Sequence, residues 1–352
     1  MINRECAFVG DWLRVVVQHP RVSVLQQGNV LWLERLLSPA LNACGVKSKV
    51  IMPSSDVDDF VFQLGNHQIF EDLSDAPERA WAKAFDSDAG SHCFSSLFDE
   101  VSHASLVVGF EIPPFMKREF SDRGLRYISL HIHPVRFMED ISFCGYSNDF
   151  DVASTMASIS MDSHDFSRPA ARFSARLSRL DPVQGRLPDG IPVLIGQTPV
   201  DSSLIFGGKF MAFQDYGPEL EVFLRGCNEV AYLKHPLARW DKNVVEFISR
   251  GLNKTVLGVS GNSYAIIMGS TQIGPMATIS SSLGVESRLC GRECHFLLSD
   301  PRDKFRTIEL DDPRWNQMDH RLFESEFWQE IFSGGGGEIP ARLNSFHFGA
   351  SY

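Results

Sequence analysis

The sequence predicts an α/β protein of two domains, in which short strands alternate with helices. Three observations lead to this prediction. The 352 residues exceed the roughly 150 residues of one ordinary domain. With 43% hydrophobic residues, each half has enough apolar side chains for a core of its own. Short apolar runs alternate with helical stretches in both halves, and this rhythm is typical of parallel sheets covered by helices.

Composition and charge exclude several other classes of protein. Against 33 Lys and Arg there are 44 Asp and Glu, a formal charge of −11, so we do not expect nucleic acid as a partner. No apolar run has the length of a membrane span, and Met1 to Cys6 lack the pattern of a signal peptide. The seven cysteines are scattered without a Cys-x-x-Cys pair, so we expect reduced thiols in a cytoplasmic protein.

The first half reads as a βαβ unit followed by further strands and helices. Apolar patterning predicts a strand over 7–17, a helix over 30–41, strands over 49–52 and 105–110, a helix over 113–122 and a strand over 125–130. Residues 56–105, rich in Asp and Ser, predict a mixture of helices and loops. A helix is expected within 149–180, and the prolines and glycines of 181–192 predict the linker between the domains.

The second half alternates more regularly and predicts a parallel, doubly wound sheet. We expect strands at 192–195, 229–233, 255–259, 276–279 and 294–298. Helices are expected at 218–225, 243–250, 263–268 and 283–290. From Asp311 onward, the aromatic residues between Trp315 and Phe332 have the spacing of an amphipathic helix. The predicted domains are 1–185, 186–310, and a C-terminal helix and tail at 311–352 that packs back on the first domain.

Ligands gather at the carboxyl ends of parallel strands, because loops and helix N-termini converge there. In the second half these ends carry polar segments at 196–203, 234–236, 260–263 and 280–286. The hydroxyls of Ser280, Ser281 and Ser282 precede a helix, where they would cap it or help to form a phosphate site. Asn262 and Ser263 lie at the start of another predicted helix, where they would either cap the helix or contact a sugar or base.

Charged side chains at other strand ends suggest chemistry. Lys234 and His235, with Pro236 after them, would donate to an anionic oxygen. Glu286 is either a solvated helix residue or a ligand for a ribose diol. Asp201 follows a strand in the loop that contains Gln197, and it would act as a nucleophile or general base, or else cap a turn.

In the first half, Glu111 directly follows an apolar strand, where a carboxylate is either solvated in a cleft or paired. His131 and His133 lie two residues apart and project from the same side of a strand end. Such a pair can bind metal, but no third ligand has suitable spacing, so hydrogen bonding to a substrate is the preferred interpretation.

Three motifs of the second half together resemble a known family. Gly-Gln-x-x-x-Asp-Ser-Ser begins at Gly196, Lys-His-Pro at Lys234, and Ser-Ser-Leu-Gly-x-Glu at Ser281, with Cys-Gly after it. Their order and spacing resemble the capsule-polysaccharide group of bacterial glycosyltransferases, and within it the retaining β-Kdo transferases. The resemblance covers about 110 residues, from Ile191 to Asp300. It implies the GT-B architecture, two Rossmann-like domains facing across a cleft, and CMP-β-Kdo as donor.

The resemblance also implies roles for the matching residues. His235 and Pro236 match a motif that contacts the nucleotide phosphate, and Ser281 and Ser282 match a serine motif for the same phosphate. Asp201 matches the aspartate thought to be the nucleophile. The predicted CMP site is completed by Gln197, Lys234, Asn262, Ser263, Ser280 and Glu286. The chain lacks the Gly- and Trp-rich ending of capsule-initiating members after Cys294, so their acceptor is not implied.

A mechanism follows from these roles. Loss of CMP from Kdo creates an oxocarbenium-like centre that Asp201 would stabilise or trap, while His235 and Lys234 stabilise the departing phosphate. Glu111 would deprotonate the acceptor hydroxyl, with His131 or His133 as substitutes. A single phosphate leaves, so we expect neither a metal nor another cofactor. The arginines that would hold the Kdo carboxylate or an acidic acceptor, or else lie on the solvated surface, are Arg118, Arg123 and Arg136.

Two other functions stay open. One is a transferase of the same architecture that uses another CMP-sugar, such as CMP-sialic acid. The other is a protein that binds nucleotides or glycans without catalysis. For the transferase, the expected partners are a CMP-sugar donor and a glycan or lipid-linked glycan acceptor. Peripheral association with the inner membrane or with other polysaccharide-assembly enzymes is compatible with a cytoplasmic location, but no basic amphipathic helix indicates it.

Overall fold

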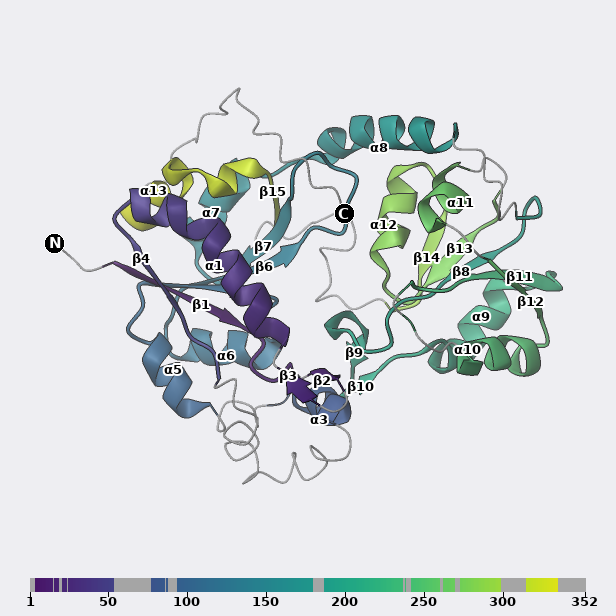
Figure 1. Ribbon diagram of the computed structural model, residues 1–352, viewed down its shortest axis with the longest axis horizontal. Coiled ribbons are helices and arrows are strands. Elements are labelled where there is room, and N and C mark those ends of the chain that lie inside the picture. Colours follow the sequence, from purple (N-terminus) through teal and green to yellow (C-terminus); the bar gives the residue numbers. More distant parts are fainter. Residues whose placement is uncertain are drawn as a thin grey trace.

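The computed structural model has two α/β domains that lie side by side, each built on one main sheet (Figure 1). We call them the N-terminal and the C-terminal domain. This arrangement confirms the predicted α/β class with parallel sheets. The structure describes residues 4–14, 16–18, 21–23, 25–53, 77–85, 87, 94–179, 187–236, 238, 242–259, 262–269, 273–298 and 315–334.

The N-terminal sheet has six strands in the order β15-β7-β6-β5-β1-β4. Their bounds are β1 Glu5–Gly10, β4 Lys47–Val50, β5 Leu106–Phe110, β6 Tyr127–Ile132, β7 Phe143–Ser147 and β15 Trp315–Met318. The four strands from β6 to β4 are parallel, whereas β7 and β15 run antiparallel to their neighbours. A small hairpin, β2 Val16–Gln18 and β3 Arg21–Ser23, follows β1.

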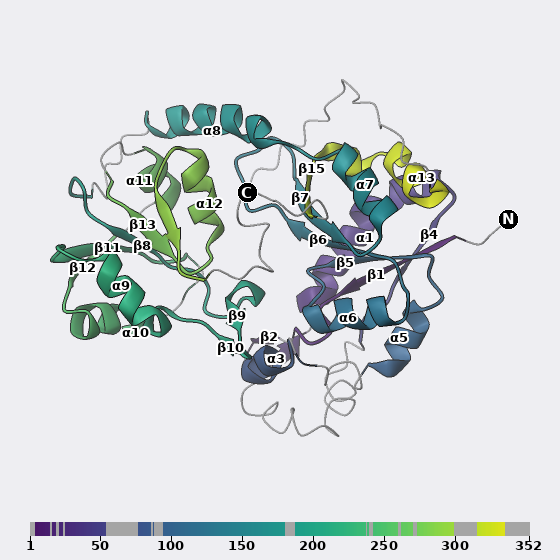
Figure 2. The same ribbon diagram turned by 180° about the vertical axis from the view of Figure 1, so that it is seen from behind.

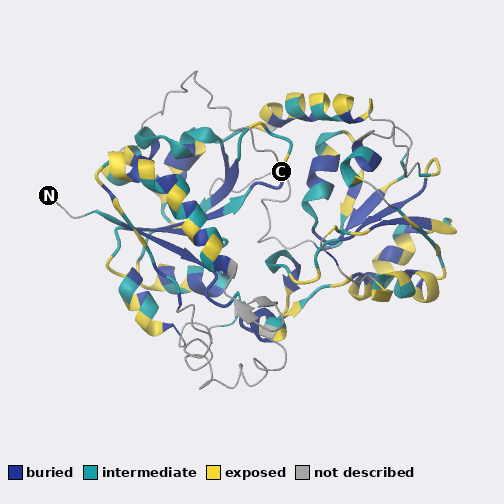
Figure 3. Cartoon of the chain, in the orientation of Figure 1, coloured by how far each residue is buried: buried dark blue, intermediate teal, exposed yellow. Residues whose placement is uncertain are grey.

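Helices cover both faces of this sheet because successive side chains of a strand point to opposite faces. Cys6 and Phe8 of β1 pack with one set of helices, and Ala7 and Val9 pack with the other. The first set is α1 Leu25–Ala43, α7 Phe150–Ser158 and α13 Ser325–Ser333. The second set is α3 Pro77–Phe85, α5 Ser95–Val101 and α6 Pro114–Asp122. Figure 3 shows the central strands of both sheets buried, whereas the edge strands β4 and β12 and the outer faces of the helices are partly exposed.

The C-terminal sheet has five strands, all parallel, in the order β12-β11-β8-β13-β14. Their bounds are β8 Val193–Ile195, β11 Glu229–Leu233, β12 Thr255–Gly258, β13 Met276–Thr278 and β14 Cys294–Phe296. One face carries α9 Gly217–Phe223 and α10 Lys242–Glu246, which continues into a π-helical turn, Phe247–Gly251. The other carries α8 Ser163–Leu177, α11 Ser263–Gly269 and α12 Ser282–Leu289.

Three segments cross between the two halves of the chain. Helix α8 precedes the predicted linker but packs on the C-terminal domain, where Ser174 Oγ donates a hydrogen bond to the Met268 carbonyl at 3.1 Å. The hairpin of β9 Ile205–Phe206 and β10 Lys209–Phe210 comes from the second half yet packs against α3 (Figure 2). Strand β15 and helix α13 return to the N-terminal domain from the end of the chain.

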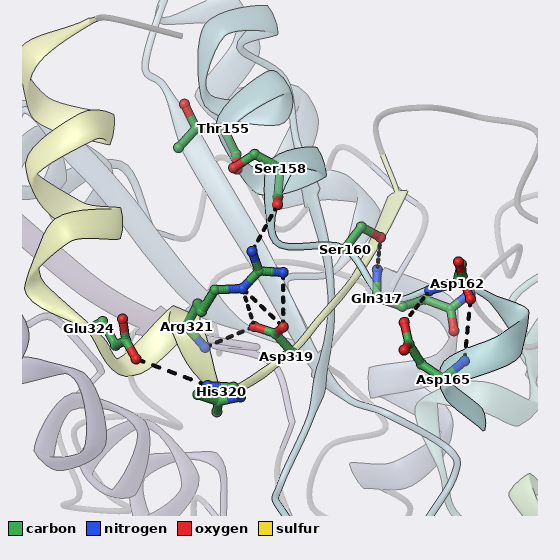
Figure 4. Close-up of polar contacts among 10 residues, drawn as sticks. All are labelled: Thr155, Ser158, Ser160, Asp162, Asp165, Gln317, Asp319, His320, Arg321 and Glu324. Atoms are coloured by element: carbon green, nitrogen blue, oxygen red, sulfur yellow. Dashed lines mark hydrogen bonds and ion pairs between the residues drawn. The ribbon is translucent and has the colours of Figure 1, made fainter. Parts of the chain in front are cut away.

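The structure corrects three predictions of secondary structure. Residues 315–318 form strand β15, not the start of a helix, because they pair with β7. Strand β1 ends at Gly10, and the segment 11–14 that follows is a turn. The stretch 149–180 forms two helices, because Asp162 caps α8 in a capping box with Asp165 (Figure 4).

Among the described residues, no helix is long and apolar enough to cross a membrane. The six cysteines of the described part of the chain are free thiols, and Cys93 lies outside it.

Candidate functional site

The strand order of the C-terminal sheet reverses between β8 and β13. Strands β11 and β12 lie on one side of β8, and β13 and β14 lie on the other. In an open parallel sheet, such a switch point leaves a crevice at the carboxyl ends of the two strands, and ligands bind there. We call this the C-terminal crevice and define it by the residues that follow these strands: Gln197, Asp201, Ser203 and Ser280.

The floor of the C-terminal crevice consists of uncharged groups that hydrogen-bond to one another. Gln197 Oε1 accepts from the Ser280 backbone N–H at 2.9 Å, and Gln197 Nε2 donates to Ser280 Oγ, also at 2.9 Å. Ser203 Oγ lies 3.2 Å from Ser280 Oγ. Gly196 permits the close approach of the next strand, because a Cβ there would lie 2.6 Å from the Tyr232 hydroxyl.

Asp201 lies at the rim of this crevice. One oxygen, Oδ1, accepts from the Ser203 backbone N–H at 2.8 Å, so Asp201 caps the short 3₁₀ helix Ser202–Leu204. The other oxygen has no hydrogen-bond partner within the described ranges. Four residues after Asp201, Ile205 is buried in the N-terminal core, so the loop is held between the two domains. The cap role and a chemical role are therefore compatible.

The N-terminal sheet has its own switch point between β1 and β5, and its crevice is charged. Arg14 Nη1 and Glu111 Oε2 form an ion pair at 2.7 Å, with side chains 18% and 24% exposed. Asp11 is buried and accepts from the Trp81 indole N–H at 2.8 Å and from the Leu13 backbone at 2.9 Å. Burial raises the pKa of Asp11 to about 6. We call Asp11, Arg14 and Glu111 the N-terminal crevice.

Glu111 stands out in backbone geometry. Its φ of +51° lies in the left-handed region, which costs a residue with a Cβ of order 1 kcal/mol or more and is found most often at functional sites. Its backbone N–H donates to the Leu130 carbonyl at 2.8 Å, which fixes the position of the residue. Burial raises the pKa of the Glu111 carboxyl, and nearby Asp201 adds to this, while Arg14 and Arg136 oppose it.

Asp201 brings the two switch points together. The carboxylate of Asp201 is close enough to Arg14 and Glu111 to influence the pKa of both. Trp81 of α3 connects the two sides, because its ring lies 5.5 Å from the Phe210 ring of the hairpin and 5.4 Å from the Arg14 guanidinium. One cation and two carboxylates from both domains therefore converge on a single region.

The predicted serine motif forms the N-terminus of α12. Ser281 is the N-cap, and its Oγ accepts from the Leu283 N–H at 3.4 Å. Ser282 is the first residue of the helix and is half-buried. Gly284 lets the helix lie against the sheet, because a Cβ there would be 3.0 Å from Thr278 Cγ2 and 2.9 Å from the Phe296 ring.

Glu286 is buried, not solvated. Its Oε1 accepts from the Arg136 backbone N–H at 2.6 Å, which joins α12 to the loop between β6 and β7 of the N-terminal domain. Burial raises the pKa of Glu286 to about 7, although the Arg136 N–H and the Tyr264 hydroxyl oppose the shift. Its Oε2 is buried without a hydrogen bond of good geometry. A contact with a ribose diol would require this side chain to become accessible.

The remaining predicted nucleotide ligands lie at neighbouring strand ends. Lys234 and Pro236 are exposed and His235 is half-buried, directly after β11. Asn262 caps α11, its Oδ1 accepting from the Tyr264 N–H at 2.9 Å. Ser263 is half-buried at the first position of that helix.

His133 does not have the predicted role. Its ring is buried and stacked on Phe166 at 4.8 Å. Nδ1 accepts from the Val135 N–H at 3.1 Å, and Nε2 bonds to Gln317 Oε1 at 2.9 Å, so neither nitrogen is left for a substrate. Burial lowers the pKa of His133 to about 4. His131 is half-buried, with Nε2 3.4 Å from Ser129 Oγ, and its contact with a substrate stays a prediction.

The sequence interpretation missed Asp11, Arg14 and Trp81. The apolar run over 7–17 hid the end of β1, although the pair Gly10-Asp11 is a signal for the end of a strand. No cluster of three His, Cys, Asp or Glu side chains suited to a metal ion forms among the described residues.

Comparisons with known proteins give little beyond this geometry. No family model and no curated protein matches the chain. Among solved structures it is similar to KpsC of Thermosulfurimonas dismutans, a β-Kdo 2,7 transferase, with 12% identity and a TM-score of 0.42 over 92% of this chain and 98% of that one. It is also similar to Methanocaldococcus jannaschii UDP-GlcNAc 2-epimerase, with 8% identity and a TM-score of 0.32 over 94% of this chain and 100% of the other. At TM-scores this low, neither likeness establishes what this chain binds or catalyses.

Proposed function

We propose that the protein is a GT-B glycosyltransferase that moves Kdo from CMP-β-Kdo to a glycan acceptor, with retention of configuration. One observation carries the proposal: Asp201, at the switch point of one parallel sheet, faces the Arg14–Glu111 pair at the switch point of the other. A donor in one crevice and an acceptor in the other would then meet at these groups. The choice of CMP-β-Kdo comes from the motif resemblance over 191–300.

The C-terminal crevice suits the nucleotide. The hydroxyl and amide groups on its floor are uncharged, the N-terminus of α12 carries the positive end of a helix dipole, and the carboxylate of Asp201 lies only at the rim, so a phosphate on the floor would meet neutral donors. His235 and Lys234, at the next strand end, would stabilise the charge on the departing CMP.

Asp201 would act as the nucleophile. The oxygen not held by the Ser203 N–H attacks the anomeric carbon while the bond to the CMP phosphate breaks, and the electron pair leaves with CMP. The acceptor hydroxyl then attacks the same carbon, transfers its proton to Glu111, and releases the Asp201 carboxylate. Two displacements at one carbon preserve its configuration. The raised pKa of Glu111 improves it as a base near neutral pH.

Arg136 would hold the carboxylate that Kdo carries at its anomeric carbon. Its side chain is exposed and close enough to Glu111 and Glu286 to affect the pKa of both carboxyls. A guanidinium there can bind a carboxylate through two parallel hydrogen bonds.

Calorimetric titration of the full chain with CMP, UDP and GDP is the first test. We expect CMP to bind at least about tenfold more tightly than the others, a difference of about 1.4 kcal/mol. Equal affinities, or no binding, would remove the CMP-sugar proposal. Turnover of CMP-Kdo against CMP-sialic acid then decides between the two donors.

Variants at Asp201 form the second test. Asp201→Asn and Asp201→Ala should abolish transfer and leave CMP affinity within about threefold, because the side chain acts on the sugar. Asp151→Asn, an exposed aspartate in the first turn of α7, is the matched control. Full activity in both Asp201 variants would show that this carboxylate is not the nucleophile.

A further inference from the structure

A separate pocket of about 540 Å³ lies under helix α8. It opens between α8, which packs on the C-terminal domain, and two N-terminal segments, the loop 137–142 and residues 319–320. None of the described residues that line it belongs to the N-terminal or the C-terminal crevice. Its volume is in the range of sites for small ligands.

The walls of this pocket are held in place by the rest of the molecule. The Phe137 ring of the loop stacks on Phe173 of α8 at 5.2 Å. The Arg136 N–H bond to Glu286 anchors the start of the same loop. On the N-terminal side, Asp319 is fixed by two hydrogen bonds of 3.0 Å from Arg321 Nε (Figure 4). The pocket is therefore formed without a ligand.

Three arginines of α8 line the pocket. Arg168, Arg172 and Arg176 are four residues apart, so they lie on one face of the helix, about 6 Å from each other along its axis. Arg168 and Arg176 make no ion pair or hydrogen bond with any described residue. Arg172 pairs with Glu139 at 3.5 Å, and both side chains are mostly exposed, so this pair contributes little. A row of available guanidinium groups is suited to carboxylates, which each can bind in two-pronged geometry.

The other lining groups favour a sugar over a bare anion. Asp140 lines the pocket beside the arginines and can accept hydrogen bonds from hydroxyl groups, which a bare inorganic anion lacks. Asp319 also lines it, but Arg321 neutralises that carboxylate. Phe137, Phe173 and Met138 supply apolar surface for the carbon face of a sugar ring. Carboxylate-bearing sugars combine the acid, the hydroxyls and the apolar face that these groups require.

We infer that the pocket under α8 binds an acidic oligosaccharide, with Arg168, Arg172 and Arg176 as its carboxylate ligands. Such a ligand would contact both domains at once. The inference does not depend on which nucleotide or donor the crevices hold, because the pocket shares no lining residue with them.

Titration of the full chain with a hexamer of α-1,4-linked galacturonate tests this, with neutral maltohexaose as the comparison sugar. We expect saturable binding of the uronate, none of maltohexaose, and weaker binding at high salt because exposed charges are screened. The double variant R168Q/R176Q should raise the Kd at least about tenfold. Arg179→Gln, an exposed arginine just beyond α8 that does not line the pocket, should change it less than about twofold.

Three results would overturn the inference. They are no saturable uronate binding at millimolar concentration, an equal loss in Arg179→Gln, and binding of phosphatidylglycerol vesicles without binding of the uronate. CMP titrations of R168Q/R176Q separate this site from the proposed donor site. Unchanged CMP affinity with lost uronate binding supports a separate pocket, and a parallel loss of both would show that the variant acts on the crevices.

Discussion

The N-terminal and C-terminal crevices occupy equivalent positions in their sheets but differ in chemistry. In the N-terminal crevice, two carboxyls of raised pKa lie around one arginine. In the C-terminal crevice, an amide and two serine hydroxyls bond to one another, and Asp201 stands only at the rim. In the proposed mechanism, the same topology would therefore supply proton transfer on one side and neutral donors for a charged ligand on the other.

The difference has a physical reason. A phosphate brings its own negative charge, so its site gains from uncharged donors and a helix N-terminus and loses from nearby carboxylates. A base must bind the proton of a hydroxyl strongly yet be ionised near neutral pH, so a carboxyl base gains from partial burial, which raises its pKa. Variants that change the charge or the hydrogen bonds of one crevice should therefore impair the role proposed for that crevice.

The largest effect is expected at Glu111. Glu111→Gln removes the base and should lower transfer to the acceptor about thousandfold, within the range for general base catalysis, while hydrolysis of the donor by water falls less. Rates of transfer and hydrolysis measured on the same preparation check this. Glu100→Gln, an exposed residue paired with Lys49, is the control. Equal losses in both rates would assign Glu111 a structural role.

The next effect concerns the one buried carboxyl of α12. The pKa of Glu286 is raised from 4.5 to about 7, so the folded protein holds this proton more tightly than the unfolded chain, and stability falls as the pH rises through that interval. Relative to the parent, the free energy of unfolding of Glu286→Gln should therefore rise by about 3 kcal/mol between pH 4 and pH 8. Urea denaturation at both pH values measures it, with exposed Glu293→Gln as the control. A pH-independent difference would contradict the raised pKa.

A smaller effect is expected from Arg14. Its guanidinium lowers the pKa of Glu111, so Arg14→Gln should raise that pKa and move the acidic limb of the pH profile of kcat/KM upward by about one pH unit. The profile, not a single rate, is the measurement. Arg225→Gln, a variant of an exposed arginine, is the control. If the acidic limb of Arg14→Gln lies at the same pH as that of the control, Glu111 does not control this limb.

The smallest effect is expected at Gln197 in the C-terminal crevice. Gln197→Ala leaves the Ser280 backbone N–H without its partner, removes one of the two partners of the Ser280 hydroxyl, and should weaken CMP binding about fivefold, or about 1 kcal/mol. Calorimetric titration measures it. Gln214→Ala, which removes an exposed amide bonded to the Asn243 carbonyl, should leave CMP affinity unchanged. Loss of CMP affinity in both variants would indicate a general effect on the domain.

The C-terminal sheet was predictable because its inner strands, β11, β8 and β13, are short and mostly apolar runs. Parallel strands are buried on both faces, so their sequences carry this signal directly. The positions of Gln197, Asp201 and Ser280 follow from it, since they come immediately after β8 and β13.

The N-terminal crevice was not predictable in the same way. Glu111 was found because its strand ends sharply, but Asp11 and Arg14 lie within an apolar run that does not reveal where β1 stops. Trp81 reaches Asp11 from a helix 70 residues further along the chain, a contact that local patterns do not encode. Strand β15 was mistaken for a helix because its partner, β7, is even more remote in sequence.

Strand β15 has a consequence for how the chain is made. The N-terminal sheet receives its outermost strand and the helix α13 from residues that leave the ribosome after the whole C-terminal domain. Until then, β7 is an open edge able to pair with another chain. The nascent protein must therefore keep this edge protected while a second domain is synthesised, and a stop codon ahead of Trp315 would leave it permanently unpaired.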